Sequence, residues 1–335
     1  MTSKERSAFL YAAIVAMGGF IFGLDAALIS GTVGYITREF SLTDVQLGMA
    51  VSAPGFGVLV ALPIAGVMAN RLGRKRALQV IAALYLVSAG WSAFAPSFVH
   101  LVAARFLGGL AFTSIAMAAM YIGEIAPPRW RGKLVSMTQI NIVIGLSGAY
   151  FINYLIQQAS QSDARWVEVL GLSQYTWRWM LGSEILPALL WFALLAIIPE
   201  SPYWLVYANR LDAARATLRR ILPAEQIERH ISEMLESMRL SHQESVHTFG
   251  TQLREIFSAR MRVIFIIAIT LAIAQQSTGI NAIMFYATTV IEQLGIGTDA
   301  AFMQAIWFGI TSVVFTVIGL LLVDRLGRRP LILWG

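Results

Sequence analysis

Cysteine is absent from the 335-residue sequence, and charged residues make up only 13% of it. The absence of cysteine excludes disulfide bonds and thiolate metal sites. A soluble domain has about a quarter of its residues charged, so the scarcity of charge excludes an ordinary soluble protein. Hydrophobic residues make up 57% of the chain, which is typical of a protein that lies in a membrane.

Signatures of catalysis are also missing. The chain has no Gly-rich phosphate loop with Lys before Ser or Thr, no clustered His and carboxylates, and no nucleophile with a placed base. His230, His242 and His247 have no histidine four residues away, so we interpret them as surface residues and not as metal ligands. The sequence therefore predicts neither an enzyme nor a cofactor or metal site.

Long apolar segments dominate the chain, and eight of them are long enough to cross a bilayer as helices. The first is too long for a signal-peptide core and lacks a clear small-residue cleavage site, so we expect it to remain as a helix. The expected spans are 8–36, 45–69, 77–96, 98–122, 133–158, 177–199, 261–292 and 300–323.

Cations gather in the loops at one side of these spans. Because such loops lie in the cytoplasm, the N-terminus is predicted to be cytoplasmic. The same rule accounts for the net charge of +6, and no soluble basic domain exists to bind nucleic acid. The cations are Arg71, Arg74, Lys75 and Arg76 after the second span, Arg129, Arg131 and Lys133 after the fourth, and Arg325, Arg328 and Arg329 after the eighth.

A short basic phrase occurs twice, at 70–76 and 324–330, each time directly after an apolar span. A repeated loop at the same point of two spans indicates internal duplication, which is typical of transporters. A polar stretch at about 203–258 separates the sixth and seventh spans, and Ile227, Ile231, Met234 and Met238 recur there at helical spacing. We therefore expect a six-helix bundle over 1–200, a helical linker over 201–258 and a partial second bundle over 259–335.

Asp25 and Arg105 are charged residues that fall inside predicted spans. Asp25 lies in the first span and Arg105 in the fourth, at depths of about 16 and 10 Å from the same side. Ionisable groups inside a membrane are costly, so the two are predicted to pair. The pair is either a static packing contact or a proton site, in which movement of Arg105 switches Asp25 between its charged and neutral forms.

The seventh span carries a polar cluster that includes Gln275, Gln276, Asn281 and Tyr286. Gln276 and Asn281 would point about 140° apart on an ideal helix, but Gly279 between them predicts a broken helix that aims both at one cavity. Amides and a phenol both donate and accept hydrogen bonds, which favours a small neutral sugar or polyol as ligand. The alternative is that these groups only hold helices together.

Acidic residues at the predicted cytoplasmic ends accompany the basic loops. A network that forms in one conformation and breaks in another would act as a cytoplasmic gate; the alternative is a solvated charged face. The predicted members are Arg71, Arg74, Glu124, Arg131, Glu200, Asp324 and Arg328.

Several motifs together give the chain a family resemblance. They are Phe22-Gly23-Leu24-Asp25, the repeated Arg-x-Gly-Arg loops, Arg105 with Gly108-Gly109, residues 121–127, Trp177-Arg178-Trp179-Met180, Pro199-Glu200-Ser201-Pro202 and Gln275-Gln276-x-x-Gly279-Ile280-Asn281. From about residue 8 to its end, the chain resembles the sugar porter family of the major facilitator superfamily.

The resemblance implies an all-α fold of two six-helix bundles that works by alternating access. It implies that Gln275, Gln276, Asn281 and Tyr286 line the sugar site and that Phe22 adds an aromatic face. Asp25 with Arg105 would match the proton-coupling pair of bacterial members, which lie in the inner membrane. We therefore expect proton-coupled sugar or polyol symport; the alternatives are an uncoupled uniporter and a sugar sensor or inactive remnant.

The chain departs from the family pattern at several points. Asn70 replaces the usual Asp of the first basic loop, and Tyr203 stands where an Arg usually follows Pro-Glu-Ser-Pro. Leu146 replaces an amide that many hexose porters carry, and Ser312 lies near the place of another. The family has twelve spanning helices, whereas eight are expected here, so the chain resembles a transporter truncated after the eighth helix.

Overall fold

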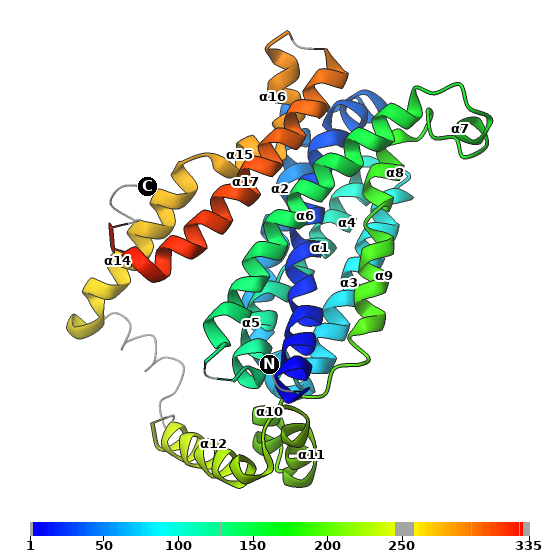
Figure 1. Ribbon diagram of the computed structural model, residues 1–335. Coiled ribbons are helices and arrows are strands. Elements are labelled where there is room, and N and C mark those ends of the chain that lie inside the picture. Colours follow the sequence, from blue (N-terminus) through cyan, green and yellow to red (C-terminus); the bar gives the residue numbers. More distant parts are fainter. Residues whose placement is uncertain (1–2, 128, 245–257, 296, 328, 331–335) are drawn as a thin grey trace.

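The computed structural model describes residues 3–127, 129–244, 258–295, 297–327 and 329–330. These residues form helices joined by turns and short loops, with no strand among them (Figure 1). The helices are α1 (Ser3–Phe40), α2 (Asp44–Leu72), α3 (Arg74–Ala93), α4 (Phe98–Ala111), α5 (Ser114–Ile125), α6 (Arg131–Ser160), α7 (Arg165–Val169), α8 (Thr176–Gly182), α9 (Ile185–Leu194), α10 (Pro202–Tyr207), α11 (Leu211–Ile221), α12 (Ala224–Glu244), α14 (Ala259–Ser277), α15 (Ile280–Phe285), α16 (Ala287–Gln293) and α17 (Thr298–Leu326).

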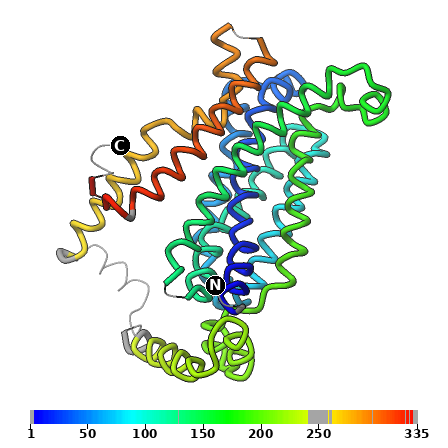
Figure 2. Tube along the Cα trace, viewed as in Figure 1, coloured from blue at the N-terminus to red at the C-terminus, as the bar shows by residue number. Residues whose placement is uncertain are grey.

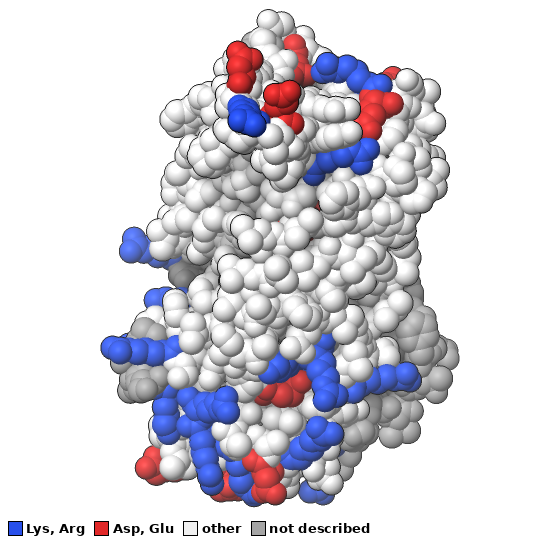
Figure 3. All heavy atoms as spheres, turned by 90° about the vertical axis from the view of Figure 1, so that its right-hand side faces the viewer, with Lys and Arg blue, Asp and Glu red and all other residues white. Residues whose placement is uncertain are grey.

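Six helical segments of the described chain are long and apolar enough to cross a membrane. The two other predicted spans form helices with different features. The 20-residue α3 begins with three cations, and the span predicted at 177–199 is interrupted between α8 and α9. Pro187 has no backbone N–H to donate to the carbonyl of Ser183, which accounts for the interruption. Figure 3 shows a broad uncharged belt between charged groups gathered toward the two ends of one face.

The 38-residue α1 runs through the middle of the first bundle, which α1–α9 form. Most of its apolar window is buried, and its closest neighbour is α6. Glycines permit this approach: a Cβ at Gly23 would collide with the backbone carbonyl of Ile142, and one at Gly145 with that of Phe20. Close packing of this kind is typical of membrane helices.

The repeated basic loop has the same backbone geometry in both copies. α2 and α17 each have 29 residues, and each ends at a glycine with positive φ: Gly73 at φ 90°, ψ 165° and Gly327 at φ 80°, ψ 166°. This region of backbone conformation is essentially restricted to glycine. The duplication predicted from sequence therefore extends to the local structure.

The second bundle is represented by α14 to α17. Thr278 and Gly279 interrupt the first of its helices, and Gly279 adopts φ 72°. Figures 1 and 2 show that α16 and the start of α17 lie against the first bundle at one end, whereas α14 and the end of α17 diverge from it. Thr288 donates to the carbonyl of Ser30 at 2.5 Å, and Tyr150 donates to that of Met284 at 2.8 Å.

Helices α10 to α12 cover the end of the first bundle at which the chain begins (Figure 1). Pro223 directly precedes α12, and Ile227 and Ile231 on that helix are buried, as the spacing predicted. Lys4 Nζ donates to the carbonyl of Leu222 at 2.5 Å, which ties α1 to this layer.

Candidate functional site

Asp25 and Arg105 meet in the middle of the first bundle. Each side chain is 2% exposed, and the guanidinium forms an ion pair with Oδ1 of Asp25. It also donates to the backbone carbonyl of Asp25 at 3.4 Å. Gly108 allows α4 to approach α3 beside this pair, because a Cβ at that position would lie 2.6 Å from Ser88 Oγ. The pairing deduced from depth is therefore present in the structure.

Glu184 is a third buried ionisable group in this place, and sequence reasoning missed it. It lies in the interruption between α8 and α9, is 3% exposed, and has its carboxyl within hydrogen-bonding reach of the Asp25 carboxyl once one of them is protonated. The signal was available, because Glu184 is an acid inside the predicted span 177–199. The principle that drew attention to Asp25 applies to it equally.

The three groups form an unbalanced ionic cluster of two carboxyls and one guanidinium. Among the described residues, Asp25 Oδ2, Glu184 Oε1 and Arg105 Nε have no hydrogen-bond partner. Buried polar atoms without partners are costly. A single proton between the two carboxyls would supply a donor to unpaired oxygens and bring the net charge of the cluster from −1 to zero.

The break in the seventh span brings two predicted sugar ligands together. Asn281 Nδ2 donates to Gln276 Oε1 at 3.1 Å across Gly279, although the two residues would diverge on a continuous helix. Gln275, Gln276 and Asn281 are exposed in this structure. The amide oxygen of Asn281 and the amide nitrogen of Gln276 have capacity for further hydrogen bonds.

The two predicted aromatic ligands have different surroundings. Tyr286 is half-buried at the junction of α15 and α16, close to the amides in sequence. Phe22 packs edge-on against Phe112, with ring centroids 4.5 Å apart, in the first bundle. The structure also places Leu146 in the buried core and lets Ser312 donate to the carbonyl of Phe308 at 2.9 Å.

Three of the predicted gate residues form one network at the N-terminal end of the bundle. Arg74 is buried and donates to Glu124 through Nε at 3.1 Å and through Nη2 at 2.8 Å. Glu200 accepts from the backbone N–H groups of Arg74 and Lys75 at 2.8 and 3.0 Å. Ser201 donates to Glu124, which joins the two halves of the network. Such charge-assisted bonds are about twice as strong as neutral ones.

Two of the departures from the family pattern, Asn70 and Tyr203, belong to this network. Asn70 Oδ1 accepts from Arg74 Nη1 at 3.3 Å, so the neutral residue retains an acceptor role. The guanidinium of Arg74 lies 6.0 Å from the ring centre of Tyr203, at cation–π range. An aromatic ring thus supplements the two acids around Arg74.

The other predicted gate residues do not join the buried part of the network. Arg71 at the end of α2 and Arg131 at the start of α6 are exposed. The side chain of Asp324 and all of Arg328 lie outside the part of the chain that the structure describes. So far as the described residues show, the network of predicted gate residues is formed by contacts between residues 70 and 203.

Comparison with known proteins places this geometry in a family. The model of the family described as "Sugar (and other) transporter" matches residues 11–335. The chain belongs to this sugar transporter family. It is 32% identical over 327 residues to the arabinose-proton symporter of Bacillus subtilis, covering 97% of this chain and 68% of that one.

A further relative and a solved structure are also similar to this chain over most of its length. The D-xylose-proton symporter of Escherichia coli is 32% identical over 367 residues, covering all of this chain and 71% of the relative. A solved structure of the proton:xylose symporter XylE, bound to 6-bromo-6-deoxy-D-glucose, matches with a TM-score of 0.82, 31% identity, and coverage of 97% of this chain and 71% of that one. The fold is thus the major facilitator fold, and the protein is a multi-pass membrane transporter and not an enzyme.

Proposed function

We propose that this transporter moves a small neutral sugar or polyol together with a proton by alternating access. The buried Asp25–Glu184–Arg105 cluster carries the proposal, because one proton decides whether its net charge is −1 or zero. A net charge is costly in a low-dielectric interior, so protonation and rearrangement of the cluster are thermodynamically linked. The relatives named as arabinose-, xylose- and galactose-proton symporters support the same function.

Alternating access would join this cluster to the amides of the second bundle. α15 and α16 both contact α1, and Thr288 of α16 donates to the carbonyl of Ser30, so a rearrangement around Asp25 on α1 reaches α15, which carries Asn281. A proton that crosses about 100 mV gains about 2.3 kcal/mol, and one pH unit adds about 1.4 kcal/mol. Coupled one to one, this drives roughly 500-fold accumulation of a neutral solute.

The proposed location is the bacterial inner membrane, with the N-terminus and α10–α12 in the cytoplasm. The cations of the 70–76 loop and of Arg129 and Lys133 support this orientation, since they lie at the same end as the N-terminus. The gate network of Arg74, Glu124 and Glu200 would then face the cytoplasm.

Uptake into proteoliposomes tests the symport proposal. We expect an inward proton gradient to stimulate sugar uptake by the wild-type chain and by Asp163→Asn, an exposed control. Asp25→Asn is expected to lose the stimulation while its uncoupled exchange persists. Equal stimulation of Asp25→Asn would contradict the proposal, and uptake indifferent to the gradient in every variant would indicate a uniporter.

Sugar binding without transport is a second candidate function. The amide oxygen of Asn281 and the amide nitrogen of Gln276 have capacity for further hydrogen bonds, so this pair can bind a sugar without any movement of the chain. The chain spans about 68–71% of the length of the relatives it matches. A ligand-induced rise in thermal stability without any uptake would support this alternative, whereas uptake above that of empty liposomes would exclude it.

A further inference from the structure

We propose that a cleft between the start of α1 and the start of α6 binds an anionic phospholipid. This inference is independent of sugar transport and rests on a different part of the molecule. The cleft has a volume of about 260 Å³ and its lining consists of Glu5, Phe9, Pro127, Trp130, Lys133, Leu134 and Met137. In the proposed orientation it lies at the cytoplasmic end of the helices.

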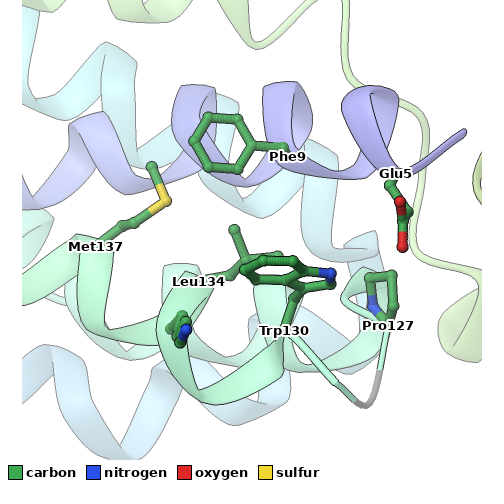
Figure 4. Close-up of a pocket in the computed structure, with 7 residues that line it drawn as sticks. Glu5, Phe9, Pro127, Trp130, Leu134 and Met137 are labelled. Atoms are coloured by element: carbon green, nitrogen blue, oxygen red, sulfur yellow. The ribbon is translucent and has the colours of Figure 1, made fainter. Parts of the chain in front are cut away.

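The walls of the cleft are apolar and its shape is that of a slot. Figure 4 shows Phe9 on α1 across from Trp130, with Leu134 and Met137 of α6 on the Trp130 side. Phe9 is 45% exposed, although most of the apolar part of α1 is buried. A volume of this size holds a segment of one acyl chain and not a whole lipid.

The slot continues into a face of α6 that points away from the protein. Met137, Ile144, Phe151 and Leu155 follow one another at intervals of seven, seven and four residues, so they share one side of the helix. Ile144, Phe151 and Leu155 are 43–50% exposed. In the proposed arrangement this stripe faces hydrocarbon, and an acyl chain in the slot extends along it.

Polar groups at the same level suit a phosphate. Trp130 Nε1 is buried and has no hydrogen-bond partner among the described residues, so the proposal requires the ring to turn before this N–H donates to a phosphate. Lys133 Nζ lies 5.2 Å and the Arg129 guanidinium 5.7 Å from the Trp130 ring centre. Glu5 is the acidic residue in the lining of the cleft, and it already interacts with another group of the protein.

Charge complementarity selects the occupant. Two cations beside one acid give the site a net positive charge, and positive groups at the cytoplasmic surface attract anionic lipids. Tryptophan and lysine at a helix end are also typical of the membrane boundary, where phosphate groups lie. An anionic phospholipid fills the apolar slot with an acyl chain and offsets the positive charge. Free phosphate has no acyl chain for the slot, and a zwitterionic lipid has no net negative charge.

Native mass spectrometry of the purified chain in detergent tests the proposal with added phosphatidylglycerol, phosphatidylethanolamine or inorganic phosphate. We expect retention of phosphatidylglycerol only. Lys133→Ala should weaken it about fivefold, from about 1 kcal/mol per cation at the membrane surface. Trp130→Phe, which removes the N–H and keeps a ring, should weaken it about tenfold.

Controls separate this site from general charge attraction and from misfolding. Arg220→Ala removes an exposed cation on α11 and should leave retention unchanged, and Lys133→Arg should restore what Lys133→Ala loses. Retention that is equal for the two lipids, equal in wild type and Lys133→Ala, or reduced equally by Arg220→Ala would overturn the proposal.

Discussion

The two ends of the chain differ in how their membrane helices are covered. In the most apolar 18-residue window of Lys4–Phe40, 78% of the residues are buried, whereas the windows of Met261–Phe285 and Thr298–Val323 reach 0% and 6%. The first bundle holds the ionic cluster in a packed interior, and α14–α15 present amides on an exposed surface. We infer that the proton site lies in the first region and that the second region carries the amides of the candidate sugar site.

Removal of Arg105 should cause the largest loss. Arg105→Ala leaves Asp25 and Glu184 buried without their cation, and breaking a buried ion pair in this way costs about 3–5 kcal/mol. Thermal unfolding in detergent measures the loss. In an Asp25→Asn background the same substitution should cost much less; equal cost in both backgrounds would show that the two groups are not coupled.

Packing between α1 and α6 should give the next largest effect. Gly23→Ala places a methyl group against the carbonyl of Ile142, and overpacking of this kind costs about 1–3 kcal/mol. Gly319→Ala on α17 is the matched control, because nothing lies within 4 Å of its added Cβ. That variant should be stabilised by up to about 1 kcal/mol through helix propensity. Similar melting temperatures for the two variants would contradict the difference in packing between the two regions.

Substitution of Gln276 should separate recognition from stability. Gln276→Ala lies on an exposed segment and should change the free energy of unfolding by no more than about 0.5 kcal/mol. Sugar affinity should fall about tenfold through the lost hydrogen bonds. Isothermal titration with the transported sugar gives the affinity, and a loss of stability without a loss of affinity would assign Gln276 to helix packing.

The smallest effect concerns the layer of α10–α12, outside the membrane. The hydrogen bonds and charge of Arg215 hold the pKa of Glu228 below its usual value of 4.5. A lowered pKa in the folded state means that this contribution is present above the usual pKa and is lost as the pH falls through the folded value. Proteolysis between α11 and α12 should therefore accelerate slightly in acid, and Glu228→Gln should remove that pH-dependent component.

Much of this architecture could be predicted from the sequence, because local rules determine it. Apolar length predicted the helices, Gly279 predicted the break, and the repeated loop predicted two equivalent helix ends at Gly73 and Gly327. The interruption of the span at 177–199 was missed, since it depends on Pro187 and a turn inside an apolar run. Glu184 could have been identified as an acid inside that span, but its contact with Asp25 could not be predicted, because it arises only through tertiary packing.

The predicted gate residues show the same limit of prediction from sequence, because their contacts depend on tertiary packing. Charge pattern alone placed Arg71, Arg74 and Arg131 together, but only Arg74 is buried beside Glu124 and Glu200. The choice depends on the positive φ of Gly73, which lets the Glu200 carboxyl approach the start of α3. A Cβ at Gly73 would collide with that carboxyl. Counting the charges in the loops does not reveal this steric requirement.

The proton site is tested most directly by sugar-driven proton movement in weakly buffered proteoliposomes that contain no other ions able to carry the coupling. Addition of the transported sugar should raise the external pH for the wild-type chain and for Asp163→Asn. Asp25→Asn and Glu184→Gln should each abolish the pH change, although they still exchange sugar. A full proton signal in either of these two variants would contradict the assignment of the buried cluster as the coupling site.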